Sequence, residues 1–140
     1  MIWRFDSGLA VTGVQDAAAA LTLTPAQQVT IGLACDGVPA TIFSPLRSCT
    51  GTATSTLLTL PQTGTQNPDH NPDRVQARNL FDVAFGTDNL VRQLEHGKVA
   101  LRFTIMNVMN KEALYNFLST FSGTHFVTPR TYQASLGYTF

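Results

Sequence analysis

The residues best suited to chemistry in this chain are two cysteines, three histidines and a short acidic stretch. Cys35 and Cys49 are the only cysteines among the 140 residues. Asp69, His70 and Asp73 lie close together and offer carboxylate and imidazole ligands for a cation. The same stretch contains two Pro and two Asn, which favour consecutive turns, and it lacks the spacing of a calcium-binding loop. We therefore predict turns there and no metal site.

The sequence contains no recognisable set of residues for nucleophilic catalysis. A triad needs a Ser or Cys beside a His and a carboxylate, but His70, His96 and His125 fall in predicted turns or loops. The sequence contains no G-x-S-x-G, no phosphate-binding Gly-rich loop, no H-E-x-x-H and no C-x-x-C. We therefore assign no catalytic residue, no cofactor and no metal, and we predict that the chain is not an enzyme.

The two cysteines enclose a segment that can bend back on itself, because it contains Gly37, Pro39 and Pro45. Two Cys without nearby His ligands make a poor zinc site. A Cys pair within a long loop of a chain with export-like features predicts a disulfide between Cys35 and Cys49. The alternative is two unpaired cytosolic thiols, which the other signs of export disfavour.

Charge is scarce along the chain. Only 13% of the residues are Asp, Glu, Lys or Arg, about half the share in typical soluble domains, and nine acids balance nine bases. Without net charge or a basic cluster, nucleic-acid binding is not expected. No apolar run reaches the roughly 18 to 20 residues of a spanning helix, so membrane insertion would require β-strands. The first residues lack a signal-peptide pattern, so an exported chain is expected to be a piece of something longer.

Four segments alternate apolar and polar residues with the period of a β-strand: about 2–12, 75–90, 98–108 and 131–140. One face of each segment contains large apolar residues, and the other contains small, polar or charged residues. A soluble sandwich would more often bury its large side chains and place Lys or Glu outside. Apolar side chains toward lipid and polar ones toward a lumen are typical of a membrane barrel. The aromatic residues on the apolar faces are Trp3, Phe5, Phe81, Phe85, Phe103, Tyr132 and Tyr138.

The connections between these strands alternate long, short and long, as in outer-membrane barrels with long external loops and short periplasmic turns. In the first connection, about 13–74, Asp16 is expected to cap a helical turn over residues 17–21. Thr24 is expected to begin a helix from Pro25 to about Leu33.

The later connections are predicted in the same way. Residues 92–98 form a hairpin connection, with Gly97 available for a positive φ. In the second long connection, about 109–130, Asn110 is expected to cap a short helix that ends near Leu118.

The end of the chain contains three motifs in a fixed order. An N-x-x-N-K step follows the third strand, a P-R-T step opens the last strand, and that strand ends in Phe. These positions are Asn107, Asn110, Lys111, Pro129, Arg130, Thr131 and Phe140. In order and spacing they resemble the C-terminal end of TonB-dependent outer-membrane receptors, in particular the Oar-like subgroup. The upstream segments WRFDSGLAVTG and LLTLPQTGTQNPDHNPDRVQARNLFDVAFGTDNL and the looped Cys pair extend the resemblance to nearly the whole chain.

The resemblance implies an all-β fold. Residues 1–140 would form an antiparallel meander of about four strands, the C-terminal segment of a transmembrane β-barrel, with two long external loops that carry short helices. The family's plug domain and TonB box are absent from this segment. The implied partners are the remaining barrel strands and plug, the barrel-assembly machinery and outer-membrane lipid, with TonB acting only through the missing N-terminal part. The implied function is ligand uptake across the outer membrane of a Gram-negative bacterium, with energy coupled through TonB.

The final strand is predicted to be an assembly signal. In this family, the assembly machinery recognises a last strand that ends in an aromatic residue and has apolar residues at alternate positions before it. Leu136, Tyr138 and Phe140 supply that pattern, whereas Ser135 stands where the signal usually has Gly. Phe140 could instead serve only in the aromatic girdle at the membrane interface.

The second function class is a small secreted soluble β-rich binding module with one disulfide. Such a module would bury Phe81, Phe85, Phe103 and Leu136 in a closed core, whereas a barrel segment would leave them uncovered. Four strands cannot close a barrel of the family's diameter. The isolated chain is therefore expected to have unpaired edges and to be unstable or to aggregate.

Overall fold

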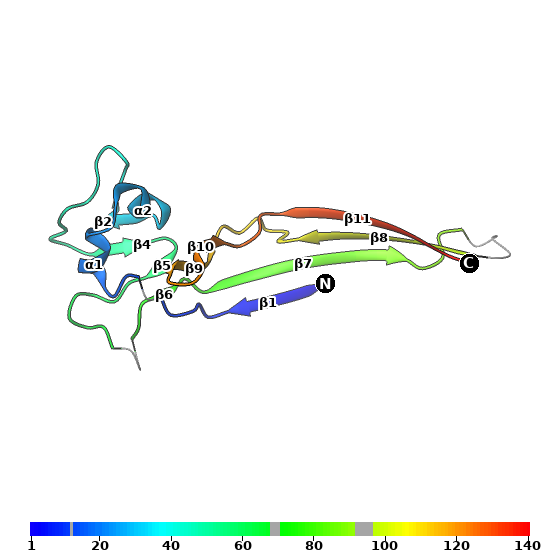
Figure 1. Ribbon diagram of the computed structural model, residues 1–140, viewed down its shortest axis with the longest axis horizontal. Helices are drawn as coiled ribbons and strands as arrows, with labels where there is room; N and C mark the ends of the chain where they lie inside the picture. Colours follow the sequence, from blue (N-terminus) through cyan, green and yellow to red (C-terminus); the bar gives the residue numbers. More distant parts are fainter. Residues whose placement is uncertain (12, 68–70, 92–96) are drawn as a thin grey trace. The chain divides into compact units, whose positions relative to one another are not determined.

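The computed structural model describes residues 1–11, 13–67, 71–91 and 97–140 (Figure 1). The fold is all-β, with antiparallel sheets and two short helices in the described residues. The chain divides into two compact units. The sheet unit comprises Met1–Asp6, Asn79–Glu112 and Val127–Phe140, and the loop unit comprises Ser7–Arg78 and Ala113–Phe126. No helix in the described part of the chain is long and apolar enough to cross a membrane.

The sheet unit contains four strands in the order β1-β7-β8-β11 (Figure 1). β7 pairs antiparallel with β8, and β8 pairs antiparallel with β11 over its whole length, from Thr131 opposite Met106 to Thr139 opposite Lys98. This sequential order confirms the predicted meander. The strands are β1 (Ile2–Asp6), β7 (Arg78–Thr87), β8 (Lys98–Met106) and β11 (Thr131–Thr139).

The first two strands are shorter than predicted. β1 ends at Asp6 rather than near residue 12, because Gly8 has a φ of +89°, which turns the backbone away from an extended course. The predicted second strand is divided, since Arg74–Val75 forms β6 of the loop unit and β7 begins only at Arg78. Thr12 and residues 92–96 of the predicted hairpin connection lie outside the described residues.

The predicted positive φ of Gly97 depends on residue 96, which lies outside the described residues. The structure gives one reason for glycine at this position, which is its close approach to Tyr138. A Cβ at this position would lie 2.5 Å from the hydroxyl of Tyr138, so glycine leaves room for the Tyr138 ring.

The loop unit consists of small sheets and two helices. Its three sheets have the strand orders β3-β2-β4, β5-β6 and β10-β9. Its elements are α1 (Ala17–Leu21), α2 (Pro25–Thr30), β2 (Leu33–Cys35), β3 (Val38–Pro39), β4 (Ala53–Ser55), β5 (Leu58–Thr59), β6 (Arg74–Val75), β9 (Leu114–Ser119) and β10 (Gly123–Phe126).

Both helices begin at the predicted caps. The Asp16 side chain accepts a hydrogen bond from the Ala19 backbone N–H at 2.9 Å. Thr24 and Gln27 form a capping box, in which each side chain bonds the other residue's backbone N–H. The second helix ends at Thr30, short of the predicted Leu33, because Gly32 has a φ of +61° and β2 starts at Leu33.

The helix predicted after Asn110 is wrong. Residues 114–119 form β9, which pairs antiparallel with β10. Leu114 and Phe117 of β9 are buried in the hydrophobic core of the loop unit. Tertiary packing therefore decides the conformation of this segment over its local helix-start signal.

The core of the loop unit draws on both of the long connections between sheet strands. Residues from 11–75 and residues from 114–117 pack in a single cluster. The segments that were predicted as long loops therefore form one folded unit. Its buried core residues are Val11, Val14, Ala20, Ile31, Leu33, Ala40, Leu58, Val75, Leu114 and Phe117.

Candidate functional site

The sheet unit has an apolar face, which the strand register assembles from β7, β8 and β11. Because side chains alternate along a strand, residues aligned in antiparallel register share a face. The ring centroids of Phe85 and Phe103 are 5.3 Å apart, and those of Phe103 and Tyr132 are 6.3 Å apart. The aligned sets are Val83 with Ile105 and Tyr132, Phe85 with Phe103 and Ala134, Leu101 with Leu136, and Val99 with Tyr138.

This apolar face is open to solvent in the sheet unit. Phe85 is 61% exposed and Leu136 is 73% exposed, while Phe81 and Phe103 are half-buried. Tyr138 and Phe140 at the end of the chain are also exposed, with ring centroids 6.2 Å apart. The residues of the predicted assembly signal therefore lie on an uncovered face. Contiguous exposed apolar surface of this kind marks a site of contact with a membrane or a partner.

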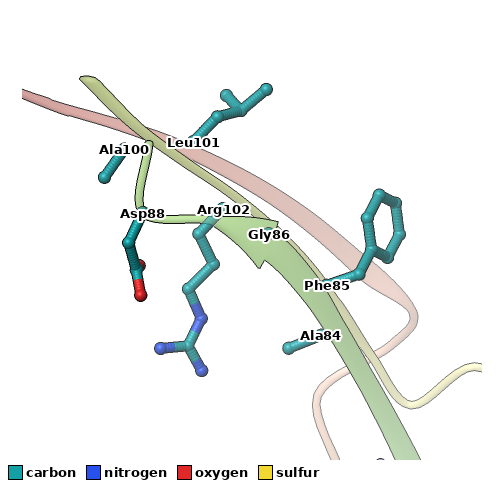
Figure 2. Close-up of a pocket in the computed structure, with 7 residues that line it drawn as sticks. All are labelled: Ala84, Phe85, Gly86, Asp88, Ala100, Leu101 and Arg102. Carbon is teal, nitrogen blue, oxygen red and sulfur yellow. The ribbon is translucent and has the colours of Figure 1, made fainter. Parts of the chain in front are cut away.

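The opposite face of the sheet has small and charged side chains. Figure 2 shows Phe85 and Leu101 on one side of the strands and Ala84, Asp88 and Arg102 on the other. These residues, with Gly86 and Ala100, border a shallow hollow of about 250 Å³. The charged side chains among these residues are those of Asp88 and Arg102.

A charged pair links the first two strands. The Arg4 guanidinium of β1 lies 2.8 Å from the Asp82 carboxylate of β7. The other carboxylate oxygen, Oδ1, accepts a hydrogen bond of 2.9 Å from the Asn107 backbone N–H, just past the end of β8. Asp82 therefore connects three strands of the sheet unit. No local sequence signal indicated these partners, because they are separated by 25 and 78 residues.

Two asparagines of the N-x-x-N-K step fasten the end of β8 to the start of β11. The Asn107 side-chain amide donates to the carbonyl oxygens of Lys111 and Thr128, both at 3.0 Å, and its Oδ1 accepts from the Lys111 N–H at 2.8 Å. The Asn110 Oδ1 accepts from the Arg130 N–H at 2.9 Å. Both residues have a φ of +49°, which Asn adopts more readily than most residues. We call Asn107 and Asn110 the asparagine clamp.

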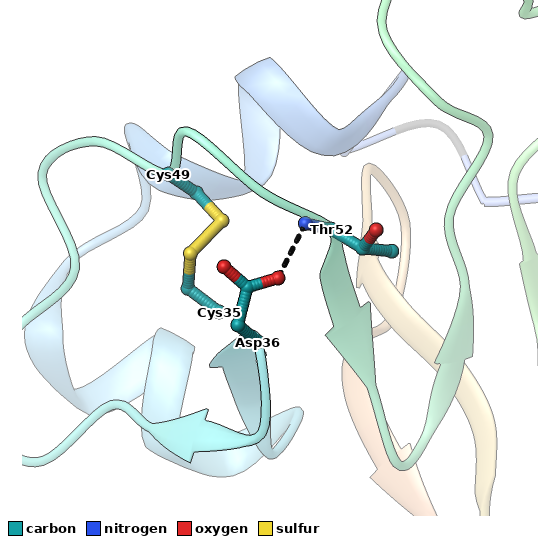
Figure 3. The surroundings of a disulfide bond; sticks show 4 residues. All are labelled: Cys35, Asp36, Cys49 and Thr52. Atoms are coloured by element: carbon teal, nitrogen blue, oxygen red, sulfur yellow. Dashed lines mark hydrogen bonds between the residues drawn. A yellow bond between two sulfur atoms is a disulfide. The ribbon is translucent and has the colours of Figure 1, made fainter.

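The predicted disulfide is present in the loop unit. Cys35 and Cys49 are bonded, with 5.7 Å between their Cα atoms. The adjacent Asp36 accepts a hydrogen bond of 2.9 Å from the Thr52 N–H, and its own N–H donates to the Thr52 carbonyl oxygen at 3.1 Å (Figure 3). The disulfide and Asp36 together fasten both ends of the intervening loop to β2 and β4.

Gln28 is a buried residue that sequence reasoning missed. Its side-chain nitrogen donates to the carbonyl oxygens of Leu21, Leu23 and Leu46, and its Oε1 accepts from the Leu46 N–H at 2.8 Å. Gln28 is 1% exposed, so its side-chain amide depends on these protein partners rather than on water. Gln28 therefore attaches the disulfide-closed loop to α2. A polar residue in a short capped helix gave no sign of this role.

The acidic stretch does not form a described site. Asp69 and His70 lie outside the described residues, as does His96. Asp73 is buried, and its Oδ2 has no hydrogen-bond partner among the described residues. Burial raises the pKa of the Asp73 carboxyl, and a hydrogen bond from its own backbone N–H opposes this shift. Within the described ranges, no group of three His, Cys, Asp or Glu residues could hold a metal ion.

No protein-family model, no curated protein and no solved structure matches this chain. The function is therefore argued from the two faces of the sheet unit, from the core and disulfide of the loop unit, and from the motifs of the sequence.

Proposed function

We propose that this chain is the C-terminal segment of a TonB-dependent outer-membrane receptor of the Oar-like kind, in which the sheet unit forms part of the barrel wall. The observation that carries the proposal is the exposed apolar face of β7, β8 and β11, opposite a face of small and polar residues. In a barrel wall, the apolar face contacts lipid and the polar face lines the lumen. The side chains that are unfavourable in water are then covered by hydrocarbon.

The connectivity supports an orientation for this wall. The chain leaves the sheet unit after β1 and after β8, and it returns before β7 and β11. Because neighbouring strands are antiparallel, both long connections join strands at the same end of the sheet. Long connections of outer-membrane barrels are external. The loop unit is then extracellular, where its disulfide persists.

In this proposal the receptor takes up a ligand with energy coupled through TonB, and the loop unit belongs to its outer surface. The remaining barrel strands and the plug complete the pore, and TonB acts on the plug side of the receptor. A strain lacking the gene for this chain should share a growth defect on some nutrient source with a strain lacking TonB. A defect that the TonB-deficient strain does not share would contradict the energy coupling.

A secreted soluble binding module is the second candidate, because the loop unit has its own core and disulfide. As an account of the whole chain, it conflicts with the exposure of Phe85 and Leu136, which a soluble module would bury.

Fractionation of the bacterium that encodes the chain tests the two candidates. With an antibody raised against the loop unit, we expect the protein in the outer-membrane fraction, with an electrophoretic mobility that changes on heating, as for a folded barrel. An antibody signal in the culture medium or in the soluble periplasm would contradict the barrel and support the soluble module.

The assembly role of the final strand has a separate test. Deleting Phe140 from the full-length receptor should lower the folded, membrane-inserted fraction, whereas Phe140→Tyr, which keeps a terminal aromatic residue, should leave it close to the wild-type value. If the deletion also inserts normally, Phe140 serves only in the aromatic girdle.

A further inference from the structure

The side-chain pattern of β8 and β11 does not determine a single register for their pairing. Both strands alternate apolar and polar residues over nine positions. A shift by one residue would exchange the two faces, but a shift by two would keep every apolar side chain on the apolar face. A tight turn would fix the register, but the connection from 107 to 130 is far longer than a hairpin turn. The observed pairing must therefore be selected by contacts other than the side-chain pattern and the turn.

We propose that the asparagine clamp sets this register and thereby positions β11. Asn107 directly follows β8, Arg130 directly precedes β11, and Thr128 lies three residues before β11. The clamp bonds from Asn107 to Thr128 and from Asn110 to Arg130 are 3.0 and 2.9 Å long. A two-residue shift would move these partners by about 7 Å along the strand, beyond hydrogen-bond reach. The clamp bonds therefore form only in the observed register.

The clamp is also fixed to the rest of the sheet. The Asn107 N–H donates to Asp82, which pairs with Arg4, and the Val108 N–H donates to the Phe81 carbonyl oxygen at 2.8 Å. One hydrogen-bonded network therefore runs from β1 through β7 and β8 to the start of β11. The Asn107 side chain is 2% exposed, so these bonds form in a partly dehydrated setting where a lost partner is costly.

Register matters for a barrel wall, because the stagger of neighbouring strands determines the shear and the diameter of the closed barrel. A shifted β11 would also displace Leu136, Tyr138 and Phe140 relative to β8. Asn107 and Asn110 are thus positioning residues for the strand that carries the predicted assembly signal. The clamp positions β11 through contacts that lie within the sheet unit. The importance of this position for barrel assembly rests on the proposed function.

Disulfide cross-linking of the full chain in detergent micelles tests the register directly. Ser135→Cys with Arg102→Cys reports the observed register, because these residues are aligned. Ser135→Cys with Ala100→Cys, or with Thr104→Cys, reports a two-residue shift in either direction. Peptide mapping separates these bonds from the native Cys35–Cys49 bond. In the otherwise unmodified chain we expect only the first pair to cross-link efficiently.

Asn107→Ala should raise the ratio of shifted to observed cross-link by about tenfold, as expected from the loss of hydrogen bonds to a buried amide. Asn107→Gly keeps the positive φ accessible and should behave like the Ala variant if the side chain sets the register. Asn110→Ala, which removes a single bond, should have a smaller effect and provides a variant that disturbs folding less. The matched control is Asn79→Ala on β7, whose side chain bonds Trp3 rather than β11, and it should leave the ratio unchanged.

An unchanged ratio in all the clamp variants would overturn the inference. So would an equal loss of all cross-links, because a residue that only stabilises the fold weakens every pairing alike. The cross-linking does not depend on membrane location. If the register shifts as expected but the protein is soluble, the clamp stands and the receptor proposal fails.

Discussion

The loop unit and the sheet unit treat large apolar side chains in opposite ways. Ile31, Leu33 and Phe117 of the loop unit are almost completely buried. Phe85 and Leu136 of the sheet unit are mostly exposed to solvent. Both units are parts of one chain with 44% hydrophobic residues, so composition does not explain the contrast. The difference is in arrangement. The loop unit packs its apolar residues in a closed core, whereas the sheet unit has them on one exposed face of a single sheet.

The contrast indicates that the two units are built for different surroundings. The loop unit covers its own apolar residues in a closed core and has capped helices and a disulfide, features that favour folding in water. A single sheet layer has no second layer to bury its apolar face, so it needs lipid or protein there. The contrast supports the proposal that the sheet unit is part of a barrel wall and that the loop unit lies outside the membrane.

The strongest way to break this comparison is to place a charge on each face of β11. Leu136→Arg puts a cation on the apolar face, and Ser135→Arg puts the same cation on the polar face one residue away. In a bilayer, the first should cost about 2–4 kcal/mol near the membrane midplane, and the second should cost little. The measurement is the folded, heat-modifiable fraction of the full-length protein in outer membranes. Equal effects of the two variants would show that the faces do not differ in their surroundings.

The second test acts on the loop unit alone. Replacing Cys35 and Cys49 by Ser removes the cross-link of a loop of about 15 residues, for which the chain-entropy model gives roughly 3 kcal/mol. The measured loss should be smaller, because Gln28 and Asp36 also hold this loop. Hydrogen exchange of loop-unit amides should accelerate, while amides of β8 and β11 keep their protection. Loss of protection in both units at once would contradict their independence.

The sheet unit was largely predictable from the sequence, and the loop unit was not. The period-two pattern of β8 and β11 is a local signal, and it gave both their bounds and their faces. The helix caps Asp16 and Thr24 were also predicted correctly, because a cap depends on residues close together in the sequence. The sequence prediction failed after Asn110, where the expected helix is strand β9. It also misplaced strand ends at Gly8 and in the divided second strand, where the chain passes from one unit to the other.

The loop-unit core could not be predicted, because its members come from distant parts of the chain. Leu114 and Phe117 pack with Val14 and Leu58, and no periodic pattern connects these positions. The same holds for Arg78, a buried cation whose guanidinium lies over the Tyr115 ring and donates to the Leu114 carbonyl oxygen. The N-x-x-N-K step was recognised as a motif, but the geometry of the asparagine clamp became visible only with the structure.

A third test concerns the buried amide of the loop unit. Gln28→Ala removes four hydrogen bonds and leaves the Leu46 N–H without its partner, so we expect a loss of about 1–3 kcal/mol. The matched control is Gln62→Ala, an exposed Gln of the same unit, which should change stability by less than about 0.5 kcal/mol. Urea unfolding monitored by hydrogen exchange of α2 and β2 amides measures both. A loss no larger than that of the control would mean that the disulfide alone holds the loop.

The smallest expected effect concerns Asp73, whose buried carboxyl has a raised pKa in the folded protein. Because the folded state binds this proton more tightly than the unfolded state does, the contribution of Asp73 to stability is fully present below its ordinary pKa of 3.8. It is lost as the pH rises through the raised value. Asp73→Asn removes this titration and the negative charge of a buried carboxylate. It should therefore stabilise the loop unit at pH 7 by on the order of 0.5 to 1 kcal/mol.

Hydrogen exchange of loop-unit amides between pH 4 and pH 7, corrected for the intrinsic exchange rate, measures the Asp73 effect. The wild-type loop unit should lose protection relative to Asp73→Asn as the pH rises. The control is Asp88→Asn in the sheet unit, which should leave the loop-unit profile unchanged because Asp88 borders the sheet hollow. A wild-type loop unit that gains stability relative to Asp73→Asn with rising pH would reverse the sign. It would mean that Asp73 is paired as a carboxylate and stabilises the closed core rather than straining it.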